Sequence, residues 1–162
     1  MKMHKSLHAI ALVFSFLPFA VQAQDFGAGL DAFSSGDGQA ALREWGPLAA
    51  QGDPRAQFWL GRMYAIGEGV NQDYIVAVDW YRRAAAQGFA IGQRGLGQHY
   101  AYGHGVPQDY VLAHMWFDIA LENGDYVREY RDFIERRMTG SDISKALKKA
   151  HICLESGYRT CE

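Results

Sequence analysis

The stretch DPRAQFWLGRMYAIGEGVNQDYIVAVDWYRRAAAQG, Asp53–Gly88, is followed directly by FAIGQRGLGQHYAYGHGVPQDYVLAHMWFDIALENG, Phe89–Gly124. Aligned without a gap, the two stretches share fifteen identical residues over 36 positions. A fixed period of this length is typical of helical solenoids, in which each repeat completes its core only by packing against its neighbours. We therefore expect an all-α solenoid, a fold that more often presents an extended surface to partners than builds a catalytic pocket.

Each repeat begins with an amphipathic helical pattern. In the first copy Ala56, Leu60 and Tyr64 recur every four residues, which predicts a helix over about residues 54–65. Gly67 follows the last of these residues and can adopt the left-handed conformation that ends a helix. The spacing therefore predicts a first helix that stops at a glycine-rich turn.

A second helical pattern follows the turn. Asp73 is the expected N-cap, because its carboxylate can accept hydrogen bonds from the free amides of a helix start. The apolar face of this helix consists of Ala77, Trp80, Tyr81, Ala84 and Ala85. Gly88 is placed to end it. Each repeat is therefore predicted to be a helical hairpin.

The framework of the first copy reads Leu60-Gly61-x-x-Tyr64-x-x-Gly67-x-Gly69-Val70-x-x-Asp73-x-x-x-Ala77-x-x-Trp80-Tyr81-x-x-Ala84-Ala85-x-x-Gly88. This pattern resembles the Sel1-like repeat, a relative of the tetratricopeptide repeat with a longer turn between its helices. The second copy departs mildly, with Phe117 and Leu121 at two apolar positions. The resemblance implies a short right-handed α-solenoid of helical hairpins, with one repeat over residues 53–88 and another over residues 89–124.

The segments on either side of the repeats are expected to cap the solenoid. Residues 24–52 resemble a tetratricopeptide hairpin whose turn is about five residues shorter. In residues 125–162 the apolar spacing from Tyr126 to Met138 predicts one helix, and a second begins near Thr139 and ends before Gly157.

The first 23 residues have the composition of a secretory signal peptide. Lys2 and Lys5 form a basic start, residues 10–21 are largely apolar, and residues 21–23 fit a cleavage site before Gln24. A membrane anchor is the alternative, but the run is shorter than the roughly 20 apolar residues that span a bilayer. We therefore expect a periplasmic or secreted protein that is not inserted in a membrane after cleavage.

The charge of the predicted mature chain argues against nucleic acid as a partner. Removal of Lys2 and Lys5 from the 16 basic residues leaves 14 against 18 acidic residues, a formal net charge of −4. Charges of both signs are interspersed, whereas a phosphate-binding surface requires clustered lysine and arginine.

The two cysteines, Cys153 and Cys161, are predicted to form a disulfide. An exported protein folds in an oxidising compartment, and Gly157 allows the chain to reverse between them. The alternative is two free thiols in a reducing compartment. Neither cysteine belongs to a Cys-x-x-Cys redox motif.

Three histidines, His99, His104 and His114, occur only in the second copy, where the first has Met63, Glu68 and Val78. They come from the first helix, the turn and the second helix, and a metal site requires side chains that converge. We interpret them as variable positions and expect no bound metal and no cofactor.

No catalytic motif is recognisable in the sequence. It contains no Gly-x-Ser-x-Gly elbow and no His-Glu-x-x-His, and Gly67-x-Gly69 recurs as a helix-to-helix turn without a preceding strand. Some cysteine-rich secreted proteins with similar repeats have been linked to β-lactam binding or hydrolysis, but they carry a cysteine pair in each repeat, which neither copy here has. We expect a protein that is not an enzyme.

Positions that the framework leaves free are the candidate binding residues. In hairpin solenoids the first helices tend to line the concave side, and a stripe along them comprises Arg55, Trp59, Arg62 and Ile66, with Ile91, Gln98 and Tyr102 at equivalent positions. Large aromatic side chains beside arginines have the composition of an interaction hot spot. The alternative is that Trp59 and Tyr102 pack against a neighbouring hairpin.

Two functions follow from this sequence. The first is an adaptor or regulator that binds a protein or an extended peptide through its concave surface. The second is a structural scaffold of the cell envelope without a dedicated groove.

Overall fold

A computed structural model describes residues 25–161 of the 162-residue chain. All regular structure within this range is helical, which confirms the predicted all-α class. The helices are α1 (Phe26–Ser34), α2 (Gly38–Ala50), α3 (Pro54–Ile66), α4 (Tyr74–Ala85), α5 (Ala90–Tyr102), α6 (Tyr110–Glu122), α7 (Arg128–Glu135) and α8 (Gly140–Glu155). The predicted signal segment, residues 1–23, lies outside the described residues.

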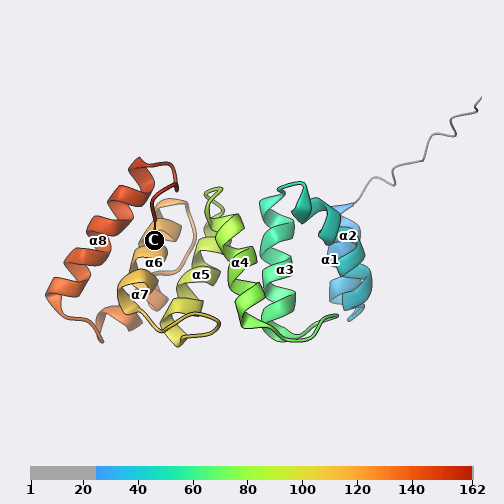
Figure 1. Ribbon diagram of the computed structural model, residues 1–162, viewed down its shortest axis with the longest axis horizontal. Helices are drawn as coiled ribbons and strands as arrows, with labels where there is room; N and C mark the ends of the chain where they lie inside the picture. Colours follow the sequence, from blue (N-terminus) through green and yellow to red (C-terminus); the bar gives the residue numbers. More distant parts are fainter. Residues whose placement is uncertain (1–24, 162) are drawn as a thin grey trace, which may run out of the picture.

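The helices pair as hairpins that follow one another along the long axis of the molecule, from α1 and α2 at one end to α8 at the other (Figure 1). Each hairpin packs against the next through its second helix, so α2 contacts α3 and α4 contacts α5. The first helices of the two repeats, α3 and α5, also touch each other. This stacking is the architecture of a solenoid.

The second helices keep the 36-residue register, even in the N-terminal hairpin. Asp37, Asp73 and Asp109 are the N-caps of α2, α4 and α6, and each carboxylate accepts at least one backbone amide of the first helical turn. The predicted cap at Asp73 is confirmed. The N-terminal unit therefore differs from the repeats in its first helix and its turn.

The long turn of each repeat packs against the preceding unit. Gly67 and Gly103 end α3 and α5 in the left-handed conformation, with φ of 75° and 72°. A Cβ atom on Gly69 would overlap the backbone of Gly38 at the start of α2, and one on Gly105 would overlap the backbone of Tyr74 at the start of α4. Within residues 25–161 no unit precedes the N-terminal hairpin, so its short turn has no such contact to make.

A buried glutamine joins consecutive units at the opposite end of the hairpins. Gln57 Nε2 donates to the carbonyl oxygen of Ala49 over 3.1 Å, and Gln93 Nε2 donates to that of Ala85 over 3.2 Å. Each glutamine also accepts a hydrogen bond, 2.8 Å long in both cases, from the amide side chain before the last glycine of its repeat. Buried amides that are paired in this way fix the rotation of one hairpin relative to the next.

The core consists of two clusters of buried side chains. The N-terminal cluster lies between the first hairpin and α3 and contains Ala41, Trp45, Ala49, Ala56, Leu60 and Met63. The larger cluster extends from α4 to α8. Alanines at the helix contacts let the backbones approach closely, and aromatic rings fill the remaining space.

The first helix of the C-terminal cap is shorter than predicted at both ends, since Met138 lies beyond its last residue, Glu135. The helix expected to include Tyr126 starts only at Arg128, and the Tyr126 side chain is almost fully exposed. Val127 and Ile134 supply the buried contacts instead. The next predicted start is confirmed, since Thr139 caps α8 by accepting a hydrogen bond from the Asp142 amide.

The chain after α8 folds back onto the repeats, so the C-terminus lies beside α6 in Figure 1. A disulfide joins Cys153 in α8 to Cys161, as predicted. Between them, the Tyr158 hydroxyl donates to Asn123 Oδ1 over 3.0 Å, and its ring lies against Gly88. The disulfide thereby closes a loop that covers the ends of both repeats.

Candidate partner-binding surfaces

The predicted stripe on α3 lies partly against the first hairpin. The Arg55 guanidinium is 4.4 Å from the centre of the Phe26 ring and forms an ion pair with Asp53 over 2.6 Å. This pairing lowers the pKa of the Asp53 carboxyl, mainly through the hydrogen bond from the Arg55 side chain. Arg55 therefore links the start of α3 to α1.

Trp59 is a packing residue. Its ring stacks on Trp45 with centroids 5.0 Å apart and meets the edge of Phe33 at the same distance. Phe58 contributes a third ring at 5.7 Å. The structure thus places Trp59 against the preceding hairpin, the arrangement that the sequence left open as an alternative to partner contact.

Arg62 is held in place but remains open to solvent. Its guanidinium lies 4.9 Å from the Trp59 ring centre and 5.3 Å from that of Phe33. The side chain is exposed. An arginine that is already ordered by two aromatic rings loses less side-chain entropy when it binds a carboxylate or carbonyl group of a partner.

Ile66 and Tyr102 are the exposed apolar members of the predicted set. They occupy equivalent positions at the ends of α3 and α5, and their exposed fractions are 53% and 52%. Gln98, one turn before Tyr102, is half-buried. Because α3 and α5 are in contact and have the same orientation within their repeats, these side chains lie on one face of the molecule.

Tyr102 continues into an aromatic stack that crosses to the preceding repeat. The His104 ring lies 5.8 Å from that of Tyr102 and 4.6 Å from that of Tyr74, nearly parallel to both. His99 lies beneath the stack, with Nδ1 2.8 Å from the carbonyl oxygen of His104. Burial lowers the pKa of His99, so its imidazole is neutral at physiological pH.

His114 belongs to a buried charged cluster at the junction of α6 and α7. Nε2 lies 2.9 Å from Glu135 Oε1, and Nδ1 lies 2.8 Å from Asp118 Oδ2. Arg131 also reaches Asp118, over 3.7 Å, and Glu135, over 3.5 Å. Burial opposes the charged imidazole, but the two carboxylates outweigh it and raise the pKa of His114.

The three histidines have different environments, and their interpretation as variable positions stays a prediction. His99 and His114 are buried and have defined polar contacts, whereas His104 is exposed in the turn as expected. Within residues 25–161, no three histidine, cysteine, aspartate or glutamate side chains are arranged to hold a metal ion. No helix in the same range is long and apolar enough to cross a membrane.

The repeats match a known family in sequence. The Sel1 repeat matches residues 54–89 and 90–125, each one residue later than the unit that the 36-residue period defines. A Sel1 repeat protein from Oxalobacter formigenes is 40% identical, with a TM-score of 0.57, over 65% of this chain and 83% of its own. The chain belongs to the Sel1 repeat family.

A second solved Sel1-type structure covers more of this chain but extends well beyond it. It is a protective antigen present in uropathogenic Escherichia coli strains, displays an SLR fold, and is 32% identical with a TM-score of 0.75. The match covers 80% of this chain and 30% of the antigen. A comparison with curated proteins gives no match.

Sel1 repeat proteins generally mediate protein–protein interactions and are typically scaffolds without catalytic activity. That general role fits a molecule whose open surfaces, rather than an enclosed cavity, carry the accessible aromatic and arginine side chains. In this Sel1 repeat protein, sequence reasoning missed the His114 cluster and the Tyr74–His104–Tyr102 stack. The sequence did carry one signal for the cluster: residue 114 is a histidine where the first repeat has the apolar Val78.

Proposed function

We propose that this chain is an adaptor that binds a protein or an extended peptide through the first-helix face of its repeats. The face comprises Arg62, Ile66, Gln98 and Tyr102, with Arg55 and Trp59 as the layer that supports it. The proposal rests on the matched exposure of Ile66 and Tyr102 at equivalent positions of adjacent helices. Two apolar anchors beside an ordered arginine have the composition of a binding hot spot.

The fold does not need these exposed side chains for its core. Apolar framework positions of both repeats are buried or half-buried, whereas Ile66 and Tyr102 contribute large apolar surface to solvent. Because adjacent repeats present the same position one hairpin apart, an extended segment that crosses α3 and α5 would contact both anchors. An extended peptide is therefore the partner geometry that this face suits best.

Site-specific crosslinking tests the proposal. A photoreactive amino acid at position 66 or 102 is expected to capture the same partner from the native organism. The matched control is position 147 on α8, where Leu147 is 51% exposed. Capture of the same proteins from all three positions would contradict a dedicated first-helix surface and favour the scaffold function.

Affinity for the captured partner then quantifies the site. The double variant Ile66→Ala/Tyr102→Ala is expected to weaken binding by at least about tenfold, the usual effect of removing hot-spot side chains. Trp59 is unsuitable for this test, because its loss would disturb the aromatic cluster and hence the fold. An unchanged dissociation constant for the double variant would refute the assignment of the anchors.

We also propose that the protein is exported and works in the periplasm or outside the cell. The support is the signal-like composition of residues 1–23 together with the Cys153–Cys161 disulfide, a bond that persists in oxidising compartments. Mass spectrometry of the protein from the periplasmic fraction is expected to find a chain that begins at Gln24 and has no free thiol. Recovery of the uncleaved chain with two thiols from the cytoplasm would contradict export.

A further inference from the structure

One position of the second helix carries a different type of residue in each of the first three hairpins. Gly46 in α2, Arg82 in α4 and Asp118 in α6 are spaced by the 36-residue period. Since the second helices share their caps and register, these residues occupy the same place in successive hairpins. What each one contacts can therefore be compared directly.

In the middle hairpin the position is filled by an arginine that binds a tyrosine of the next unit. Arg82 Nη2 donates a hydrogen bond to the Tyr100 hydroxyl over 2.8 Å. Tyr100 itself is almost fully buried on α5. The guanidinium thus covers and pairs the hydroxyl of the tyrosine that belongs to the Sel1 framework.

In the N-terminal hairpin this position is Gly46, so the equivalent tyrosine of the next unit, Tyr64 in α3, has no such arginine. Tyr64 precedes Tyr100 by 36 residues, and its hydroxyl has no hydrogen-bond partner within the described part of the chain. A Cβ atom on Gly46 would meet nothing within 4 Å. The position that carries Arg82 in the next hairpin therefore carries no side chain here, and a side chain could begin at it without a clash.

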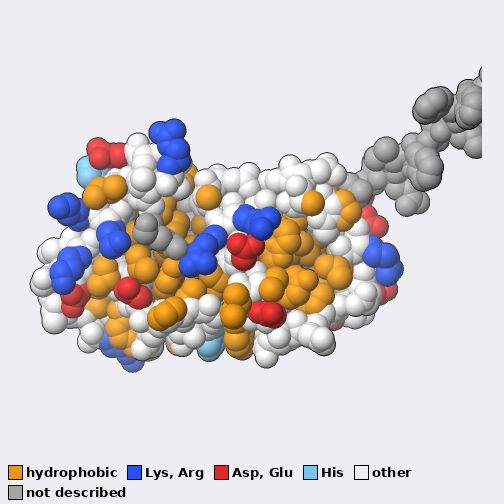
Figure 2. Space-filling model, viewed as in Figure 1, with side chains coloured by type: hydrophobic (Ala, Val, Ile, Leu, Met, Phe, Trp, Pro, Cys, Tyr) orange, Lys and Arg blue, Asp and Glu red, His pale blue; other side chains and the backbone are white. Residues whose placement is uncertain are grey.

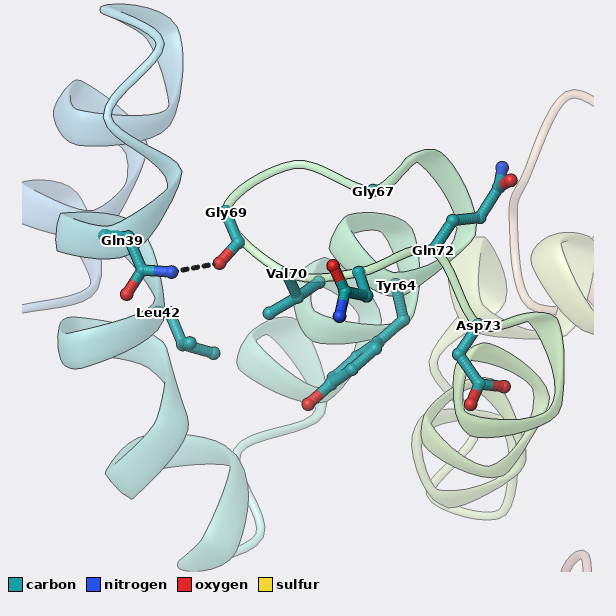
Figure 3. A pocket seen from close by; sticks show the side chains of 9 residues that line it. Gln39, Leu42, Tyr64, Gly67, Gly69, Val70, Gln72 and Asp73 are labelled. Carbon is teal, nitrogen blue, oxygen red and sulfur yellow. Dashed lines mark hydrogen bonds between the residues drawn. The ribbon is translucent and has the colours of Figure 1, made fainter.

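A pocket of about 700 Å³ lies beside Tyr64, between α2 and the α3–α4 turn. Figure 3 shows the Tyr64 ring beneath the turn, with Leu42 of α2 on one side and Asp73 at the start of α4 on the other. Gly46 lies one helical turn after Leu42 and therefore on the same side of α2. We call this site the Tyr64 pocket.

The lining of the Tyr64 pocket complements a cation with an apolar stem. Among the residues that the structure describes, Asp73 is the only charged one that lines it, and none is a lysine or arginine. The backbone amides of Ile75 and Val76 both donate to Asp73 Oδ1, over 2.9 and 3.1 Å. The other carboxylate oxygen, Oδ2, is therefore not needed for the helix cap. Leu42 and Val70 supply apolar contact surface.

We propose that the Tyr64 pocket receives an arginine side chain from a protein partner, in the way that Tyr100 receives Arg82 from the neighbouring hairpin. The guanidinium would donate to the Tyr64 hydroxyl, and its methylene stem would lie on Leu42 and Val70. This proposal goes beyond the first-helix surface and does not depend on it. Binding of one basic residue of the partner in the Tyr64 pocket would make the adaptor selective among partners.

Titration with short peptides, followed by NMR, tests this proposal. Acetyl-Gly-Arg-Gly-amide is expected to give saturable shifts of the Val70 and Asn71 amide signals in the millimolar range. The same peptide with citrulline, which is similar in shape but uncharged, is expected to bind about tenfold more weakly because a charge-assisted hydrogen bond is lost. Equal binding of both peptides would overturn the proposal.

Variants of the pocket give the matched controls. Tyr64→Phe keeps the ring and is expected to lose about tenfold in affinity for the arginine peptide. Gly46→Arg, combined with Pro47→Ala because a proline disfavours a helical non-glycine residue before it, is expected to fill the pocket and abolish binding. Pro47→Ala alone is expected to bind normally. Unaltered binding to the filled variant, or to Tyr64→Phe, would refute the site.

One further variant separates this proposal from the proposed function. Ile66→Ala/Tyr102→Ala removes the first-helix anchors and leaves the Tyr64 pocket intact. The arginine peptide is expected to bind this variant with unchanged affinity. A loss of peptide binding in this variant would show that the peptide contacts the first-helix face, and would overturn the assignment to the Tyr64 pocket.

Discussion

The two Sel1 repeats have the same backbone plan but different neighbours, and their differences follow the neighbours. Trp59 of the first repeat stacks on Trp45 of the small N-terminal hairpin, whereas the equivalent Gly95 leaves room for the Tyr81 ring. A solenoid repeat thus has two kinds of residue: those that recur because each hairpin needs them, and those that change with what the hairpin contacts.

The second helices show the same division. Val78 is a buried apolar residue in the first repeat, while the equivalent His114 is buried between carboxylates of α6 and α7. The surface also changes along the molecule: in Figure 2, hydrophobic side chains gather in an area toward the α1–α3 end, and charged groups are more frequent toward α8. The predictions below test this comparison, from the largest expected effect to the smallest.

The largest effect is expected at the Trp59–Gly95 pair. Trp59→Ala removes the ring that stacks on Trp45, and we expect the free energy of unfolding to fall by about 3 kcal/mol. Gly95→Ala is expected to change it by less than about 1 kcal/mol, because the tight contact with Tyr81 opposes the gain in helix propensity. Urea denaturation of both variants measures the difference. Equal losses would show that the two positions serve the same purpose.

The disulfide comes next, because it holds the tail over the ends of both repeats. Cys161→Ser is expected to cost about 2.5 kcal/mol on the chain-entropy estimate for a sequence separation of 8 residues. Cys161 is the better choice than Cys153, which is fully buried. Hydrogen exchange of α8 should accelerate in the variant. Identical unfolding curves for oxidised and reduced wild-type protein would contradict this role.

The two glutamine junctions should contribute equally to stability, because their contacts are the same in both repeats. Gln57→Ala and Gln93→Ala are each expected to cost about 1 to 2 kcal/mol, because each removes a buried amide that donates one hydrogen bond and accepts another across the junction. The two losses should agree within about 0.5 kcal/mol. A large discrepancy in urea denaturation would mean that the junctions are not equivalent.

His114 should make the free energy of unfolding depend on pH. The equivalent residue of the first repeat, Val78, cannot do so because it does not titrate. The pKa of His114 is raised in the folded state, so the stability that it contributes is fully present below about pH 6.5, its unfolded value. This contribution is lost as the pH rises through the higher folded value. Asp118, Glu135 and Arg131 are the charged groups that face the imidazole.

The variant His114→Val, which copies the first repeat, tests that dependence. Its free energy of unfolding is expected to vary less between pH 6 and 8 than that of the wild type. Val78→Thr, which is also buried but does not titrate, is the control and should keep the wild-type pH profile. A wild-type profile in the His114 variant would assign the pH dependence to another group.

The smallest effect on stability is expected at the proposed anchors. Ile66→Ala and Tyr102→Ala should each change the free energy of unfolding by less than about 0.5 kcal/mol, because both side chains are more than half exposed. Thermal unfolding measures this. A loss above about 1.5 kcal/mol would show that the residue is part of the core rather than of a free surface.

Sequence reasoning recovered the helices, caps and turns of the repeats because these depend on local spacing. The helix predicted over about residues 54–65 is Pro54–Ile66, and the cap at Asp73 and the left-handed glycine at 67 are present. The C-terminal cap was less predictable. Tyr126 fits the apolar period of α7, but the exposed position that it takes depends on how α7 packs against α6.

The candidate surface was only partly visible in the sequence. A helical stripe grouped Trp59 with Arg62 and Ile66, since all three share one side of α3. Burial then separated them, because the adjacent hairpin covers Trp59 and leaves Ile66 exposed. Which residues of a stripe stay free depends on a neighbour that is distant in the sequence.

The sequence by itself determined the repeat, its hairpin and its family, because periodic glycine, alanine and aromatic positions leave few ways to pack two helices. Only the tertiary structure decided what the differences between the copies do. His114 and Trp59 acquire their roles from side chains of neighbouring units, at Glu135 and Trp45. Local propensity is encoded within a repeat, whereas desolvation, charge pairing and open space arise only where repeats meet.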